Sequence, residues 1–267
     1  MLISYPIRRF FPNAPLVGDA AGNLYGTTDY GGSFNAYGAV FKVDKKGKET
    51  VLYSFTGGAD ECRPVGVTLG PDGDLYGVAV GTTCNQDGAV YKLDKAGNFT
   101  LLYTFGGLDG EYPDSALLFD ADGNLYGETG DGGSSIGCQS GCGVVFELSP
   151  NRTETVLYNF CSLSGCADGA GPRGNLVRDK AGSLYGITNV GGAYSDCNGG
   201  TCGTVFKLDT ARNETVLHNF TGGTDGEFPY AGLVMDWAGN LYGTAANGGD
   251  LNCDPPNGCG VVFQITP

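Results

Sequence analysis

The stretch Asp19-Ala20-Ala21-Gly22-Asn23-Leu24-Tyr25-Gly26 is the first copy of a pattern that decides the fold. The core of this pattern, Gly-Asn-Leu-Tyr-Gly or a near copy, occurs five times at intervals of 50 to 59 residues, with its tyrosine at Tyr25, Tyr76, Tyr126, Tyr185 and Tyr242. A Gly-x-Val-aromatic block follows each copy, a block such as Thr50 to Phe55 follows four of them, and a short apolar run precedes most of them. Turn residues separate these runs, so each unit of about 50 residues contains four short β-strands, which is typical of a β-propeller.

We therefore predict an all-β fold: one five-bladed β-propeller of four-stranded antiparallel blades over residues 1–267, with strands a to d numbered from the axis outward. The last unit stops after its c strand, and residues 2–7 precede the first unit. We expect this N-terminal strand to complete the last blade and close the ring, which hides sheet edges that an open array exposes. The predicted boundaries are 1–12 for the outer strand of blade 5, 13–64 for blade 1, 65–113 for blade 2, 114–172 for blade 3, 173–229 for blade 4 and 230–267 for blade 5.

The loops of the predicted blades are of two kinds. The a–b and c–d connections are tight Asp- and Gly-containing hairpins, whereas the b–c and d–a connections are long and contain all the cysteines. In a four-stranded blade the two long kinds leave on the same face. We expect a functional site on that face, because sites concentrate on loops held by a rigid scaffold.

Composition excludes several classes of protein. The 48 glycines have no three-residue period, so the chain is not collagen, and no run of 18 apolar residues could span a membrane. With 15 basic and 29 acidic side chains the net charge is −14. Such a surface repels phosphate backbones and anionic lipids, so we expect no nucleic-acid partner, no membrane insertion and a monomer.

Ten cysteines form spacings that predict five local disulfides. Three pairs occupy the same b–c loop in successive blades, one pair shares a d–a loop, and the remaining two cysteines are paired by elimination: Cys138–Cys142, Cys197–Cys202, Cys253–Cys259, Cys161–Cys166 and Cys62–Cys84. Zinc is the alternative, but it needs a second pair close by, and we place each pair on a different blade. Disulfides imply an oxidising compartment, and because Met1 to Pro6 is not a signal peptide, we expect that a leader has been removed from a secreted or cell-surface protein.

Catalytic groups are scarce. The one histidine, His218, occupies a position where other units have tyrosine, so it is interpreted as a packing residue. A Ser-His-Asp triad is therefore excluded, and pairing of every cysteine leaves no thiol nucleophile. We predict no catalytic residue.

Carboxylates and aromatic residues are the remaining candidates for a binding site. Two d–a loops share Asp-Gly-Glu-aromatic-Pro, which gives the candidate ligand-binding residues Asp109, Glu111, Tyr112, Asp225, Glu227 and Phe228. Their functional interpretation is a site for sugar hydroxyls, with the aromatic rings as stacking platforms. We expect no cofactor and no metal site; Ca²⁺ held by the acidic loops is the alternative left open. The structural interpretation is turn chemistry, in which Asp caps a loop and Pro begins the next strand.

Three further candidates and one other residue, four residues in all, break the repeat. The first a-strand positions near the axis are mostly small, which suits a narrow channel, but Asp114, Arg173 and Tyr230 depart from this pattern at the channel mouth. Glu128 likewise replaces the threonine that follows the Leu-Tyr-Gly motif in other units, such as Thr27. These departures mark the place where a site that is not repeated could lie.

The combined motif resembles the tandem repeat of Gloeo/Verruco (GloVer) repeat proteins. The resemblance rests on Asp-x-x-Gly-Asn-Leu-Tyr-Gly-Thr, Gly-x-Val-Phe-Lys-Leu, Thr-Val-Leu-Tyr-Ser-Phe and Gly-Gly-x-Asp-Gly-x-x-Pro, and residues 220–248 are the best copy. It implies a secreted or surface-anchored bacterial protein and no particular activity. The Gly-x-Leu-Tyr strand is also similar to that of tachylectin-type five-bladed lectins, which implies sugar binding.

Three functions compete on this basis. We expect first a secreted, non-catalytic binding module that recognises a polysaccharide or glycan through its loop-rich face. The alternatives are a carboxylate-based glycan-active enzyme, which would need two or three acids converging in the channel, and a structural module of the bacterial cell surface.

Overall fold

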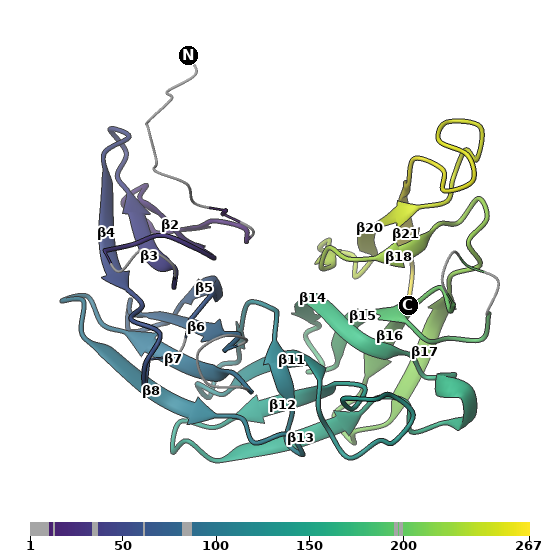
Figure 1. Cartoon of the computed structure of the whole chain (residues 1–267), viewed down its shortest axis with the longest axis horizontal. Coiled ribbons are helices and arrows are strands. Elements are labelled where there is room, and N and C mark those ends of the chain that lie inside the picture. Colours follow the sequence, from purple (N-terminus) through teal and green to yellow (C-terminus); the bar gives the residue numbers. More distant parts are fainter. Residues whose placement is uncertain are drawn as a thin grey trace.

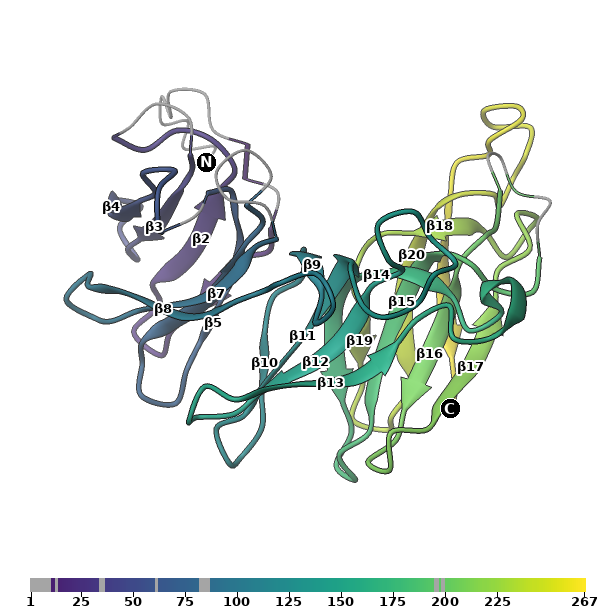
Figure 2. The ribbon, with the colours of Figure 1, turned by 60° about the horizontal axis from the view of Figure 1, so that its bottom comes forward.

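The computed structural model describes residues 11–12, 14–33, 37–60, 62–81, 87–194, 197 and 200–267. Over these residues the chain forms five antiparallel sheets and one short 3₁₀ helix, η1 (Ser164–Cys166). The fold is a β-propeller repeat, in which the sheets follow one another in chain order along an arc (Figures 1 and 2). None of the described helices has the length and hydropathy of a membrane span.

Each sheet contains the strand runs that the sequence predicts, in the order of the chain. The first sheet consists of β1 (Val17–Gly18), β2 (Leu24–Thr28), β3 (Ala39–Val43) and β4 (Glu49–Ser54). The second consists of β5 (Pro64–Leu69), β6 (Leu75–Ala79), β7 (Ala89–Leu93) and β8 (Phe99–Thr104). The third consists of β9 (Glu111–Pro113), β10 (Leu118–Phe119), β11 (Leu125–Asp131), β12 (Val144–Leu148) and β13 (Glu154–Asn159).

The last two sheets repeat this plan with one difference. The fourth sheet consists of β14 (Ala170–Arg178), β15 (Leu184–Val190), β16 (Thr204–Leu208) and β17 (Glu214–Asn219). The fifth consists of β18 (Glu227–Pro229), β19 (Val234–Met235), β20 (Leu241–Asn247) and β21 (Val261–Ile265). Both β18 and β19 pair with β20, so they are two pieces of one inner strand, and the described fifth sheet has no strand outside β21.

The Asp and Tyr of the repeated motif stabilise the hairpin between the two inner strands. In the first sheet, Asp19 accepts hydrogen bonds from the backbone N–H groups of Ala21 and Asn23 and from the hydroxyl of Tyr25, at 2.9, 2.9 and 3.0 Å. The tyrosine–aspartate bond recurs in all five sheets, at 2.9 to 3.2 Å, in the pairs Tyr25–Asp19, Tyr76–Asp72, Tyr126–Asp120, Tyr185–Asp179 and Tyr242–Asp236. One carboxylate thus satisfies the turn and fixes the tyrosine; the aspartate precedes the tyrosine by six residues in four sheets and by four residues in the second sheet.

Four hydrophobic clusters hold neighbouring sheets together. Each cluster takes residues from two successive sheets, as when Val40 and Phe55 of the first sheet pack with Tyr91 and Leu93 of the second. An edge-to-face aromatic pair crosses each boundary, with ring centroids 5.0 to 5.3 Å apart: Phe55–Tyr91, Phe105–Phe146, Phe160–Phe206 and Phe220–Phe263. The recurring Phe residues thus form the core between the sheets, where aromatic pairs contribute stability beyond that of their buried area.

At each of these boundaries a glycine, which has no side chain, leaves room for a proline of the next sheet. Gly88 has φ +92°, and a Cβ atom there would lie 2.4 Å from Cδ of Pro113. Gly38, Gly143 and Gly203 meet Pro64, Pro172 and Pro229 in the same way. The Gly-x-Val-aromatic and x-Pro motifs of successive units are therefore two halves of one contact.

The first and fifth sheets stand apart in both views (Figures 1 and 2). Residues 2–7, the predicted closing strand, lie outside the described residues, and so does Cys84, the predicted partner of Cys62. The other four predicted disulfides are present: Cys138–Cys142, Cys161–Cys166, Cys197–Cys202 and Cys253–Cys259. They indicate an oxidising, extracellular environment.

Candidate functional site

The aspartates of the long loops before the inner strands are bonded within their own loops. Asp168 accepts from the hydroxyls of Tyr158 and Ser162 and from the N–H groups of Ser162 and Leu163, at 2.8, 2.9, 2.9 and 3.2 Å. Asp60 makes the equivalent contacts with Tyr53. These bonds favour the turn-chemistry interpretation of the loop acids.

Two of the candidate ligand-binding acids, Asp109 and Asp225, occupy the same position. Asp109 accepts from the hydroxyl of Tyr103 and, at 2.7 Å, from the N–H of Gly106. Oδ2 of Asp225 lies 3.0 Å from Nε2 of His218, the residue that stands where Tyr103 stands beside Asp109. Both carboxylates accept hydrogen bonds within their own loops, so a ligand would have to compete with these bonds.

The two neighbouring glutamates have different surroundings. Glu227 is 2% exposed and accepts from Nδ2 of Asn247 at 3.2 Å, which places it inside the fifth sheet. Glu111 pairs in register with Asp131 of β11 and is partly exposed. Burial, followed by the charges of Asp87 and Asp131, raises the pKa of Glu111. The repeated Glu of the motif therefore does not define one repeated site.

The aromatic residues of these loops, Tyr112 and Phe228, have left-handed backbone conformations, with φ 55° and 53°. Arg63 and Gly171 stand at the equivalent positions before proline and have φ 55° and 59°. Each N–H donates to a carbonyl of the preceding sheet, as Tyr112 does to Asp87 at 3.1 Å. Because this conformation recurs in four sheets, it is a feature of the repeat, and its effect is to turn the side chain at this position out of the sheet.

A pocket of about 1070 Å³ lies at the centre of the arc, where the inner strands converge. All five sheets contribute to its lining. Small residues lie where the inner strands of the first three sheets approach: a Cβ atom on Gly66, which has φ +67°, would lie 3.4 Å from the Cβ atoms of both Ala14 and Ala116. The polar and aromatic residues of the lining are Asp29, Arg63, Tyr112, Asp114, Asp131, Arg173, Asn175, Asn189 and Tyr230.

The structure brings together Asp114, Arg173 and Tyr230, the three residues that break the repeat. Nε of Arg173 lies 3.4 Å from Oδ2 of Asp114, and the guanidinium carbon lies 5.8 Å from the ring centroid of Tyr230. Tyr230 is 49% exposed and stacks on Phe228 at 6.4 Å with an interplanar angle of 21°. The trio presents a carboxylate, a fork of N–H donors and an open aromatic face to one cavity.

A second ion pair in the pocket was not anticipated from the sequence. Nη2 of Arg63 lies 3.6 Å from Oδ2 of Asp29, and its guanidinium carbon lies 5.7 Å from the ring centroid of Tyr30. Arg63 occupies the x-Pro position that Tyr112 and Phe228 hold in other units. That departure from an aromatic residue is the sequence signal that could have found it.

Burial shifts two acids of the pocket, Asp114 and Asp131, toward their neutral forms. It raises the pKa of Asp114, while the guanidinium groups of Arg173 and Arg63 oppose the shift. Burial also raises the pKa of Asp131, and the charge of Arg173 opposes this shift too. The arginines therefore stabilise the charged forms of these partly desolvated carboxyl groups.

Glu128 is the most unusual acid in the described structure. It is 1% exposed, and neither of its carboxylate oxygens has a hydrogen-bond partner among the described residues. A Cβ atom on Gly186 of β15 would lie 2.7 Å from its Oε1, so the carboxyl group is packed against the fourth sheet. Burial first, and then the charge of Asp114, raise the pKa of Glu128 well above its ordinary value.

The repeat that orders these residues identifies the family. The Gloeobacter/Verrucomicrobia repeat matches residues 11–253, which is most of the chain. The chain belongs to this repeat family. No curated protein matches the sequence.

Solved structures with the same fold are distant in sequence. The luciferin-regenerating enzyme is 13% identical with a TM-score of 0.53, over 98% of this chain and 93% of that one. A gluconolactonase from Xanthomonas campestris is 15% identical with a TM-score of 0.50, over 98% and 89%. The extracellular domain of a hybrid two-component system from B. thetaiotaomicron is 13% identical with a TM-score of 0.57, but this chain spans only 27% of its length and 95% of its own. At these identities the likeness extends to the fold alone.

Proposed function

We propose that the protein is a secreted or cell-surface binding module whose central pocket takes a carbohydrate. The observation that carries the proposal is the assembly of Asp114, Arg173 and Tyr230 at one cavity, at positions where the repeat has small residues. The repeated loop acids are bonded within their loops, whereas these three side chains face the pocket. The four disulfides support an extracellular location.

The chemistry of the lining suits a polyhydroxylated ligand. Sugar hydroxyls both donate and accept, and the pocket offers carboxylate acceptors, guanidinium donors and the amides of Asn175 and Asn189. The exposed ring of Tyr230 offers a flat apolar face for the C–H side of a sugar. Three aspartates against two arginines disfavour an anionic ligand.

A glycan array on the oxidised protein tests the proposal, run once with Ca²⁺ and once with chelator. We expect saturable binding that Tyr230→Ala and Arg173→Ala each weaken at least about tenfold. Tyr194→Ala is the matched control, because Tyr194 is 48% exposed and does not line the pocket. Equal binding by Tyr230→Ala and the control would contradict the pocket. Loss of binding on chelation would instead support Ca²⁺ on the acidic loops, at Asp109, Glu111, Asp225 and Glu227.

A carboxylate-based glycan-active enzyme is the second candidate, and Glu128 is the observation that favours it. Burial favours the protonated form of the Glu128 carboxyl group, and the charge of Asp114 in the pocket raises its pKa further. Glycosidases use two carboxyl groups, one of which is kept protonated by a raised pKa.

Hydrolysis assays on xylo-oligosaccharides and on D-glucono-1,5-lactone test this candidate. If it is right, turnover is measurable and falls at least about 100-fold in Asp114→Asn and in Glu128→Gln. Turnover that survives in the double variant Asp114→Asn/Glu128→Gln would reject it, and so would the absence of turnover in the wild type.

We also propose that the five sheets close into a five-bladed ring, with residues 2–7 as the outer strand of the last blade. Val262 of β21 is 80% exposed, whereas the equivalent residues of the other four sheets, Val40, Val90, Val145 and Val205, are each 0% exposed. On the facing side of the first sheet, Leu16 and Leu24 are 51% and 42% exposed, whereas the equivalent Leu117 and Leu125 are 4% exposed. Closure would bury these two apolar faces against each other.

Paired substitutions test closure. Val205→Ala creates a cavity in a buried boundary and is expected to cost about 2 kcal/mol of unfolding free energy. In a closed ring Val262→Ala costs a similar amount, whereas in an open arc it costs almost nothing. Light scattering across a concentration series adds a check, because an open arc would join copies through the same two faces, as a structural or assembly module would, and a closed ring stays monomeric.

A further inference from the structure

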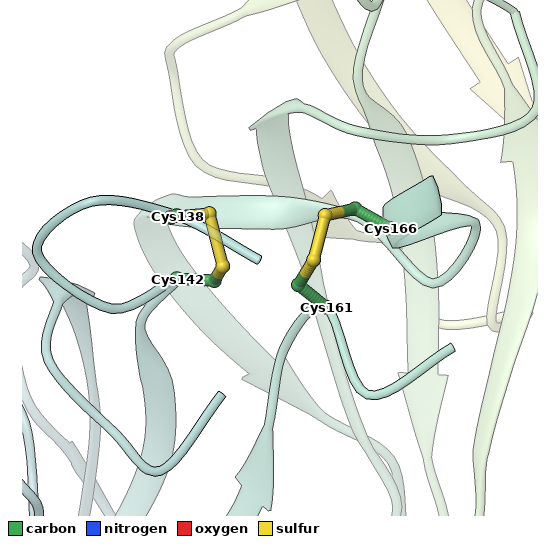
Figure 3. A group of neighbouring side chains, drawn as sticks. All are labelled: Cys138, Cys142, Cys161 and Cys166. Atoms are coloured by element: carbon green, nitrogen blue, oxygen red, sulfur yellow. A yellow bond between two sulfur atoms is a disulfide. The ribbon is translucent and has the colours of Figure 1, made fainter. Parts of the chain in front are cut away.

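The third sheet brings four cysteines together. Cys138 and Cys142 lie in the loop between β11 and β12, and Cys161 and Cys166 lie in the connection between β13 and β14. Their four Sγ atoms lie within 4.8 Å of one another. Figure 3 shows the two disulfides side by side. The expectation that no second cysteine pair comes close to the first is therefore wrong.

The two loops meet because both leave the same face of the sheet and bond to one another's neighbours. The N–H of Gly171, just after the second loop, donates to the carbonyl of Cys142 at 2.9 Å. The first loop packs directly on the second disulfide: a Cβ atom on Gly137 would lie 2.2 Å from Sγ of Cys161. Only glycine fits there, so the loops approach as closely as the backbone allows.

This arrangement occurs once among the described residues. Cys197–Cys202 and Cys253–Cys259 stand in the equivalent loops of the fourth and fifth sheets, but neither pair belongs to a described group of three or more metal-ligating residues. The connection from β17 to β18 contains no cysteine. A local disulfide in one loop does not require a second beside it, so the fourfold cluster is not a property of the repeat.

We propose that these four cysteines form a Zn²⁺ site when both disulfides are reduced. Zinc prefers four thiolates in a tetrahedron at about 2.3 Å, which places the sulfurs about 3.8 Å apart. The spacings Cys-x₃-Cys and Cys-x₄-Cys give two ligands from each of two short loops, as in structural zinc sites. Opening the two disulfides lets the sulfurs move apart to this separation while the backbone hydrogen bonds hold both loops in place.

The two states differ by a defined reaction. A phosphine reductant converts each disulfide to two thiols, and the phosphine takes an oxygen atom from water to become the phosphine oxide. The four thiols then release their protons as they bind one Zn²⁺. In the oxidised protein two disulfides cross-link the two loops internally. In the reduced protein one zinc ion would link all four cysteines, so it would restrain both loops in place of the disulfides.

Cobalt titration tests the proposal on the full chain, reduced with a phosphine under anaerobic conditions and then freed of reductant. We expect one Co²⁺ per chain, with the absorption of a tetrahedral cobalt–thiolate centre, and displacement of the cobalt by one equivalent of Zn²⁺. The oxidised protein should bind none at this site. Near-ultraviolet circular dichroism of the oxidised protein checks that each variant is folded.

Matched pair variants locate the site. Cys138→Ser/Cys142→Ser and Cys161→Ser/Cys166→Ser should each weaken cobalt binding at least about 100-fold, because each removes two of four ligands. Cys197→Ser/Cys202→Ser and Cys253→Ser/Cys259→Ser should bind as the wild type does. Absence of the cobalt–thiolate absorption in the reduced wild type would overturn the proposal, as would equal losses in the test and control pairs.

Discussion

Two sets of acidic residues in this protein have different surroundings. Asp60, Asp109, Asp168 and Asp225 recur in the repeat, and each accepts hydrogen bonds from its own loop and from the aromatic residue of the preceding strand. Asp114 and Glu128 occur once. The first forms a loose ion pair at the pocket, and the second has no hydrogen-bond partner among the described residues.

The difference separates groups that stabilise the fold from groups free to act on a ligand. A carboxylate with several short hydrogen bonds gains nothing from a ligand that must first break them. A carboxylate desolvated without such bonds raises the free energy of the folded state, and a ligand or a proton can lower it again. In this chain the repeated acids belong to the first class and the unrepeated ones to the second.

The largest expected effect is on a loop acid. Asp168→Ala leaves the N–H groups of Ser162 and Leu163 and the hydroxyl of Tyr158 without their buried acceptor, so we expect a loss of about 3 kcal/mol of unfolding free energy. Urea denaturation measures it. Asp114→Ala is the comparison and should change stability by less than about 1 kcal/mol, because it removes a charge that burial already disfavours. Equal losses of unfolding free energy in the two variants would contradict the distinction between repeated and unrepeated acids.

The second effect concerns Glu128 and depends on pH. The pKa of Glu128 is higher in the folded than in the unfolded chain, so between the two values the folded state binds more protons and stability falls as pH rises. Glu128→Gln removes this dependence. We expect the variant to match the wild type near pH 4 and to exceed it by at least about 1 kcal/mol at pH 8, since one pKa unit corresponds to about 1.4 kcal/mol. Urea denaturation at both pH values measures the difference, and a constant difference would argue against a buried neutral carboxyl group.

The third effect is on binding alone. Tyr230→Ala should weaken the affinity for a bound oligosaccharide about tenfold, because an aromatic stacking contact contributes about 1 kcal/mol or slightly more. Titration calorimetry against the best oligosaccharide of the glycan array measures it, with unfolding free energy as the control. A loss of stability as large as the loss of binding energy would assign Tyr230 to the fold.

The smallest effect concerns His218, which stands where Tyr53, Tyr103 and Tyr158 stand in other sheets. His218→Tyr restores the tyrosine that other sheets have beside the loop acid, and its hydroxyl can donate to Asp225 as Tyr103 does to Asp109. We expect a change in unfolding free energy of less than about 0.5 kcal/mol at pH 7 and unaltered ligand binding. Altered binding would mean that the loop acids take part in the site.

Local patterns in the sequence predicted the strands, the hairpins and the four described disulfides well, because each depends on residues close together in the chain. The spacing from Asp19 to Tyr25, for example, contains a whole hairpin with its bonds. The departures at Asp114, Arg173 and Tyr230 also pointed to one place.

Contacts between sheets could not be predicted in this way. Arg63 lines the pocket with Asp29 because the inner strands converge, and Cys138 meets Cys161 because two loops leave one face at a particular angle. The first contact depends on how far each sheet is rotated from the last, whereas the second depends on the course of two loops that leave the third sheet. That rotation follows from packing such as Gly88 against Pro113, which no single motif contains.

Binding at the central pocket can be tested by chemical-shift mapping with ¹H–¹⁵N NMR, in which the best oligosaccharide of the glycan array is titrated into the oxidised protein. We expect the largest shifts at residues that line the pocket outside the Asp109 and Asp225 loops, with Asp114, Arg173 and Tyr230 among them. Shifts confined to the loops of Asp109 and Asp225, or an array with no binding at all, would contradict binding at this pocket.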